Sequence, residues 1–136
     1  MHPFNYQNPK SLAEAAASLA KGGDTKLLAG GQSLIAAMKL RLSAPTELID
    51  LGGIKELTGI RMDRAGISIG AMTRHAEVAR SKQVRARIPA LAGLAGAIGD
   101  RMVRNMGTIG GSLAHNDPVA DYPAAVLGLN ATVNTN

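Results

Sequence analysis

The sequence predicts an α+β fold made of two small subdomains, and two patterns support this prediction. Residues 25–51 contain a short apolar strand, a helix and a second apolar strand, which is the pattern of a parallel strand pair joined by a helix. Residues 60–70 contain two short alternating runs around a turn, which is the pattern of an antiparallel hairpin. We therefore expect a small parallel strand–helix–strand subdomain in residues 1–53 and a second, mixed or antiparallel subdomain in residues 54–136.

The first helix is predicted to begin after Ser11, because Ser11 and Glu14 form the capping-box pattern. Apolar residues then recur at helical spacing, at Leu12, Ala15, Ala16 and Leu19. The glycine pair Gly22–Gly23 is expected to end the helix, because glycine adopts the left-handed conformation that commonly follows a helix.

The strand–helix–strand unit follows this helix directly. The apolar run at residues 26–29 predicts a buried strand, and Ser33 is placed to cap a helix over residues 33–41. Residues 47–51 predict the second strand of the unit. The glycine pair Gly52–Gly53 is the expected boundary between the two subdomains.

The second subdomain is predicted to open with a hairpin whose strands, residues 60–62 and 67–70, flank a turn at residues 63–66. The remaining signals are mostly helical, with one further strand near the end of the sequence. The expected helices cover residues 74–79, 89–98 and 120–129, and the expected strand begins at residues 131–133.

Composition excludes several kinds of site. The 136 residues include no cysteine, so the chain alone can hold no disulfide, thiol nucleophile or cysteine-bound iron–sulfur cluster. No apolar stretch is long enough to span a membrane and no leader pattern opens the sequence, which predicts a cytoplasmic protein. The net charge of +5 favours an anionic partner. A basic group in the middle of the sequence lacks interleaved aromatic residues, which favours a solvated or protein-docking face over a nucleic-acid surface; it comprises Arg80, Lys82, Arg85, Arg87, Arg101 and Arg104.

Two diglycine motifs indicate a binding site. "LAGGQSL" covers residues 28–34 and "TIGGS" covers residues 108–112, so that each motif joins a Gly-Gly pair to hydroxyl residues. Consecutive glycines let main-chain amides approach an anion closely, and the two motifs could therefore hold one diphosphate between them. A branched side chain at Gly31 or Gly110 would then occupy the space of the diphosphate. On the residues alone, the alternative that each pair is only a tight turn stays open. The sequence contains neither G-x-G-x-x-G nor the Walker phosphate-loop pattern.

Three stretches together resemble the FAD-binding medium subunit of molybdenum hydroxylases, of the aerobic carbon monoxide dehydrogenase and xanthine dehydrogenase type. They are "HPFNYQNPKSLAEAAASL", "KLLAGGQSL" and "NMGTIGGSLAHNDPVADYPAAVLGL". The resemblance implies FAD as cofactor, with an iron–sulfur small subunit and a molybdopterin large subunit as partners. Electrons would pass from the iron–sulfur clusters through FAD to an external acceptor. It also implies that the second subdomain appears truncated and that a C-terminal domain is absent. The alternatives are a flavin-free docking fragment of such a complex and a basic nucleic-acid-binding domain.

The resemblance also implies which residues contact FAD. Gly30 and Gly31 would donate from their amides and Ser33 from its hydroxyl. Asp121 would accept from a hydroxyl of the nucleotide, although capping the helix that it begins is an equally good role. Gln32 replaces the histidine that many relatives have, and its amide can still form hydrogen bonds. The full set is Leu28, Ala29, Gly30, Gly31, Gln32, Ser33, Leu34, Thr108, Ile109, Gly110, Gly111, Ser112 and Asp121. We expect no catalytic acid–base residue and no metal ligand.

Three other features have a structural interpretation that we favour over a functional one. Residues 66–70 match the G-x-S-x-G pattern, but Ser68 lies within a predicted strand and not at the strand-to-helix turn that a hydrolase needs. His75 could serve as a base or as a covalent flavin attachment point, but it lies at the start of a predicted helix. The adjacent residues His115–Asp117 favour hydrogen bonding within a loop over a shared metal ion.

Overall fold

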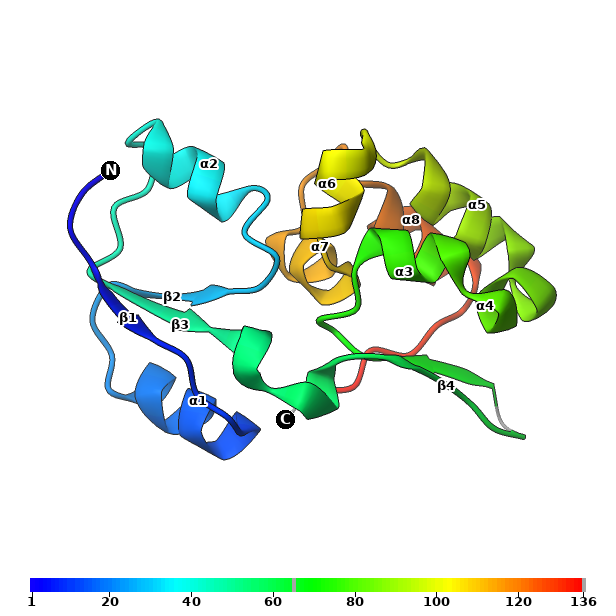
Figure 1. The fold of residues 1–136 in the computed structure, drawn as a ribbon, viewed down its shortest axis with the longest axis horizontal. Coiled ribbons are helices and arrows are strands. Elements are labelled where there is room, and N and C mark those ends of the chain that lie inside the picture. The colour runs from blue at the N-terminus through cyan, green and yellow to red at the C-terminus, as the bar shows by residue number, and fades with distance from the viewer. Residues whose placement is uncertain (65, 136) are drawn as a thin grey trace.

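A computed structural model describes residues 1–64 and 66–135 of the chain. Figure 1 shows a small sheet with one helix on each side, joined to a group of short helices that lie beside a hairpin. The parallel sheet and the separate antiparallel pair confirm the predicted α+β class.

The first sheet contains three parallel strands, β1 (Asn5–Gln7), β2 (Thr25–Leu28) and β3 (Glu47–Asp50), in the order β1-β3-β2. The parallel pairing of β2 with β3 confirms the predicted unit, and Leu28 lies opposite Asp50 at the carboxyl end of the pair. The prediction that the first strand of this unit is buried is wrong, because no residue of β2 is buried and Leu27 is 42% exposed. Strand β1 was not predicted, because Asn5–Gln7 contains no β-branched residue and its pairing partner β3 is distant in the sequence. Ligands of parallel sheets bind outside the carboxyl ends of the strands, and the first glycine motif begins there.

Helices α1 (Leu12–Ala20) and α2 (Leu34–Lys39) lie on opposite sides of this sheet (Figure 1). The Ser11 hydroxyl accepts a hydrogen bond from the Glu14 amide at 3.2 Å, which confirms the predicted cap of α1. The predicted cap of α2 is wrong, since Ser33 makes no side-chain hydrogen bond to the helix. Its backbone angles, φ −88° and ψ −49°, are already helical, whereas a capping residue adopts an extended conformation.

The core beneath the sheet consists of Ala15, Ile49 and Ile54, with Leu12, Leu51 and Leu57 packed against it. Two short 3-10 helices, η1 (Leu51–Gly53) and η2 (Lys55–Leu57), connect this part to the rest of the chain. The division at residue 53 remains a prediction, and the packing of Ile54 and Leu57 shows that the first core extends past it.

The second part opens with the antiparallel strands β4 (Ile60–Met62) and β5 (Ile67–Ile69), which confirms the predicted hairpin. The predicted turn at residues 63–66 includes residue 65, which lies outside the described residues. Residues 131–135 form no strand, so the prediction of a strand at residues 131–133 is wrong. A strand needs a hydrogen-bonding neighbour, and these residues pair with neither sheet in the part that the structure describes.

Six helices complete the second part in the residues that the structure describes. Three were predicted close to their observed positions, namely α3 (His75–Arg80), α5 (Pro89–Ala97) and α8 (Asp121–Gly128). Three were not, namely α4 (Lys82–Arg87), α6 (Arg101–Met106) and α7 (Ile109–His115). Most of their buried residues form one cluster, which consists of Val78, Val84, Leu91, Ala92, Ala95, Ile109 and Tyr122. The hairpin covers this cluster through Ile60 and Ile69.

Candidate functional site

The fold brings the two glycine motifs into contact. A Cβ added at Gly30 would lie 1.9 Å from the carbonyl oxygen of Met106, which is two residues before the second motif. A Cβ added at Gly111 would lie 3.2 Å from the Cβ of Ala29. Figure 1 shows the connection between β2 and α2 beside α7. About eighty residues separate the motifs in the chain, yet the missing side chain at Gly30 lets the two backbones touch.

The first motif presents main-chain amides that have no acceptor within the chain. Among the described residues, no hydrogen bond is made by the amides of residues 30–34, although the carbonyl of Gly31 accepts from the Ile35 amide at 3.1 Å. Gly31 has φ +75°, a conformation that an L-residue adopts only at a cost. A turn that alternates left- and right-handed conformations directs successive amides toward one point, where an anion can bind.

The second motif is the first turn of a helix and not a loop. Thr108 caps α7, since its hydroxyl accepts from the Gly111 amide at 3.1 Å. The Gly110 amide donates to the carbonyl of Ala71 at 2.8 Å, and the Ile109 amide donates to the carbonyl of Thr73 at 3.0 Å. The expectation that both motifs present free main-chain amides is therefore wrong for Gly110 and Gly111, because their amides already have acceptors within the chain.

The glycines also differ from expectation in where a side chain would point. A Cβ at Gly110 would lie 2.5 Å from the Cβ of Ala71, and one at Gly31 would lie 3.0 Å from the Ile35 side chain. Both directions point into the protein. A side chain added at either glycine would therefore disturb the packing of the chain itself, because the added atoms would meet neighbouring residues before they met a ligand.

The remaining predicted residues are distributed as follows. Gln32 and Ser33 are exposed, and Ser112 is half-buried in the first turn of α7. Asp121 is the first residue of α8 and is exposed. Its alternative role as a cap is not seen, because Ala120 occupies the capping position and no side chain bonds there. Gly107, which was not among the predicted residues, directly precedes Thr108 and lies against the ring of His75.

Behind the second motif lies a buried aromatic pair, His75 and Tyr122, with ring centroids 5.1 Å apart and tilted by 43°. Neither His75 Nδ1 nor the Tyr122 hydroxyl has a hydrogen-bond partner among the described residues. Burial lowers the pKa of His75, and the nearby Asp121 charge opposes that change. Burial also raises the pKa of Tyr122 above its ordinary range. Both rings are therefore neutral at neutral pH.

The neutral state of His75 predicts a pH dependence of stability. In the unfolded chain an ordinary histidine takes up a proton as pH falls through about 6.5, whereas the folded chain resists protonation until a lower pH. The free energy of unfolding should therefore decrease from about pH 6.5 down to the lowered pKa of His75, by at most about 1.4 kcal/mol per pH unit. Urea denaturation of the wild type and of His75→Phe at several pH values measures this slope.

The exposed His115 supplies the control for that measurement. His115→Gln should keep the slope and His75→Phe should lose it. An unchanged slope in His75→Phe would assign the titration to another group.

The other sequence features have structural roles. Ser68 lies in the middle of β5, opposite Arg61, and no helix follows it directly, so the arrangement of a hydrolase nucleophile is absent. Asp117 accepts from the Val119 amide at 2.9 Å, and Asn116 has φ +50°, so this stretch is a hydrogen-bonded turn. The described residues contain no group of three or more side chains that could hold a metal ion.

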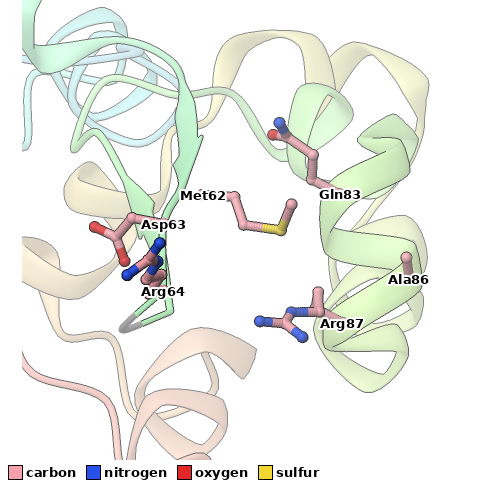
Figure 2. A pocket seen from close by; sticks show the side chains of 6 residues that line it. All are labelled: Met62, Asp63, Arg64, Gln83, Ala86 and Arg87. Carbon is pink, nitrogen blue, oxygen red and sulfur yellow. The ribbon is translucent and has the colours of Figure 1, made fainter.

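A hollow of about 520 Å³ lies away from the glycine motifs, between the hairpin tip and α4 (Figure 2). Its lining includes two arginines and a methionine. The full set of lining residues is Met62, Asp63, Arg64, Gln83, Ala86 and Arg87. It is wide open and shares no residue with the predicted site. None of the described helices is long and apolar enough to cross a membrane.

Comparison with known proteins connects these features to a family. The model of a family described as the FAD binding domain in molybdopterin dehydrogenase matches residues 2–136. The carbon monoxide dehydrogenase medium chain of Hydrogenophaga pseudoflava is 49% identical over 129 residues, which cover 94% of this chain and 45% of that protein. The glyceraldehyde dehydrogenase medium chain of Sulfolobus acidocaldarius is 40% identical over 135 residues, covering 98% and 48% respectively.

A solved structure agrees with this result. Carbon monoxide dehydrogenase from Hydrogenophaga pseudoflava, in a form that lacks the Mo-pyranopterin moiety of its molybdenum cofactor, matches with a TM-score of 0.88. The match has 51% identity and covers 90% of this chain and 43% of that chain. The chain thus spans a little less than half the length of the relatives that it matches. The predicted family resemblance is confirmed, and the chain belongs to the family of FAD-binding domains of molybdopterin dehydrogenases.

Proposed function

We propose that this chain supplies the FAD-binding part of the electron-transfer subunit of a molybdenum hydroxylase-type dehydrogenase. In the complex it would accept electrons from the iron–sulfur clusters of a small subunit, which receives them from a molybdopterin large subunit, and pass them to an external acceptor. The absence of cysteine supports this division, because the chain can bind a flavin but cannot by itself hold the clusters.

One observation carries the proposal. The unpartnered amides of residues 30–34 lie at the carboxyl end of β2, next to the helix turn that contains Thr108 and Ser112. Main-chain N–H groups that have no acceptor in the chain suit the doubly charged diphosphate of FAD. The hydroxyls of Ser33 and Ser112 would add donors, and Asp121 would accept from a hydroxyl of the nucleotide.

FAD, when bound, supplies the redox chemistry, since it can exchange electrons singly or in pairs. The chain contributes binding and orientation. The first motif would hold the diphosphate through its amides. The second would contribute side-chain hydroxyls, since the amides of Gly110 and Gly111 are already engaged.

The 136-residue chain is tested by titration with FAD, ADP and riboflavin, followed by flavin fluorescence and calorimetry. If the diphosphate is the main anchor, FAD and ADP should bind at least about tenfold more tightly than riboflavin, which lacks phosphate. Equal binding of FAD and riboflavin would contradict the diphosphate assignment. A folded chain that binds none of the three would instead be a flavin-free docking fragment.

The electron-transfer role is tested in the assembled complex. Isolation of the protein together with the subunits that copurify with it, followed by denaturation, should release FAD, molybdopterin and iron together. A complex that lacks iron or molybdopterin would contradict the proposed electron path while leaving flavin binding intact.

A further inference from the structure

The segment from Asn105 to Gly107 leads into the second motif and is held from both sides. On one side, the carbonyl of Met106 lies against Gly30, at the place where a Cβ would be 1.9 Å away. On the other side, the amide of His75 donates to the carbonyl of Gly107 at 3.0 Å. The position of this segment therefore sets how the first motif meets the second.

The ring of His75 provides the second contact on that side. A Cβ added at Gly107 would lie 2.4 Å from His75 Nε2 and 2.8 Å from its Cδ2. The backbone of Gly107, with φ −61° and ψ 143°, is open to every residue type. The imidazole ring, and not the backbone conformation, is thus what excludes a side chain at this glycine.

The ring is enclosed on its other side as well. Only 5% of His75 is exposed, and the ring of Tyr122, which is fully buried, lies behind it. Tyr122 follows Asp121 in α8 and belongs to the main core cluster. His75 thus connects the Gly107 backbone on one side to the start of α8 on the other.

We propose that His75 is a positioning residue for the flavin site: its ring fixes Gly107 and thereby holds Met106 against Gly30 and Thr108 at the start of α7. This inference rests on the proposed function, because it assigns His75 to the geometry of the diphosphate site. His75 itself touches no ligand in this assignment. The ring acts together with the main-chain hydrogen bond from the His75 amide and with the Arg74 side chain, which donates to the carbonyls of Asn105 and Met106.

A double-mutant cycle on the full chain tests the contact. Gly107→Ala should weaken FAD binding by about tenfold or more, because the new methyl group displaces the ring or the segment. His75→Ala should weaken it by a similar factor, since the segment loses its support. The decisive result is the double variant, in which adding Gly107→Ala to His75→Ala should cost less than about threefold, because the methyl group enters the space that the ring has left.

His75→Phe is the conservative variant. A phenyl ring keeps the contact with Gly107, so FAD affinity should stay within about threefold of the wild type. Val78→Ala is the structural control, since Val78 is fully buried on the same helix, whereas the atoms nearest to a Cβ at Gly107 all belong to His75. It should lower the melting temperature while leaving FAD affinity, measured well below that temperature, unchanged.

Amide hydrogen exchange of the flavin-free chain gives a second readout. In His75→Ala, protection should fall at residues 107–112, and it should stay unchanged in α1. If Gly107→Ala costs the same factor with and without His75, the inference is overturned. Unchanged exchange at residues 107–112 would overturn it as well. If the wild-type chain binds no FAD, the proposed function fails, and the exchange experiment still decides whether His75 holds the segment.

Discussion

Gly30→Ala should abolish FAD binding to the chain. The added methyl carbon would lie 1.9 Å from the carbonyl oxygen of Met106 and 2.8 Å from its carbonyl carbon. Both atoms belong to the backbone, so no side-chain rotation can relieve the overlap, and the two motifs must separate. We expect a loss of about 100-fold or more in FAD affinity, and a decrease of about 1–3 kcal/mol in the free energy of unfolding. Flavin titration and urea denaturation measure the two effects.

Gly93→Ala is the matched control for this substitution. Gly93 lies on the exposed side of α5, and a Cβ there would meet nothing within 4 Å. Alanine should leave FAD binding unchanged and stabilise the helix by up to about 1 kcal/mol. If Gly30→Ala bound FAD as the control does, the contact between the motifs would not be what builds the site.

The elements with strong local signals were predictable from sequence. The capping box at Ser11, the apolar strands of the parallel pair and the hairpin at residues 60–69 each carry their pattern within a few residues. Helices α4 and α6 were missed because neither carries an apolar stripe: Val84 is the one buried residue of α4, and α6 has none. Helix α7 was missed for a different reason: glycines disfavour a helix interior, and here Thr108 caps the helix that contains them.

The sequence predicts which residues form the candidate site, but it does not predict which atoms of these residues are in contact. The sequence shows that two diglycine motifs exist, and only the fold shows that Gly30 lies against Met106. The same holds for the amides, because the partner of the Gly110 amide is the carbonyl of Ala71, about forty residues earlier in the chain. The direction in which a side chain at a glycine would point depends on the packing between distant segments, and no local sequence pattern encodes it. His75 illustrates this point, since its burial against Gly107 depends on three separate elements.

Gly110→Ala distinguishes a glycine that faces a ligand from one that faces the protein. A methyl group at this position would lie 2.5 Å from the Cβ of Ala71 and 2.8 Å from its carbonyl oxygen. The first turn of α7 should therefore move away from Ala71 and lose the hydrogen bond between the Gly110 amide and that carbonyl. We expect unfolding to become easier by about 1–3 kcal/mol, with FAD affinity reduced by at least about tenfold as Thr108 and Ser112 move. Gly128→Ala, which meets nothing within 4 Å in the last turn of α8, is the control and should change neither quantity by more than a small amount.

Adding Ala71→Gly to Gly110→Ala separates the two explanations. Removal of the Ala71 methyl group relieves the contact at 2.5 Å but leaves the carbonyl oxygen at 2.8 Å, so stability and FAD affinity should both recover in part. If the glycine instead faced the diphosphate directly, Gly110→Ala would reduce FAD affinity without loss of stability, and Ala71→Gly would restore nothing. Partial recovery of both stability and FAD affinity would show that Gly110 serves the flavin site through the packing of α7 against Ala71. A change at Ala71 could not restore affinity if Gly110 instead contacted the ligand directly.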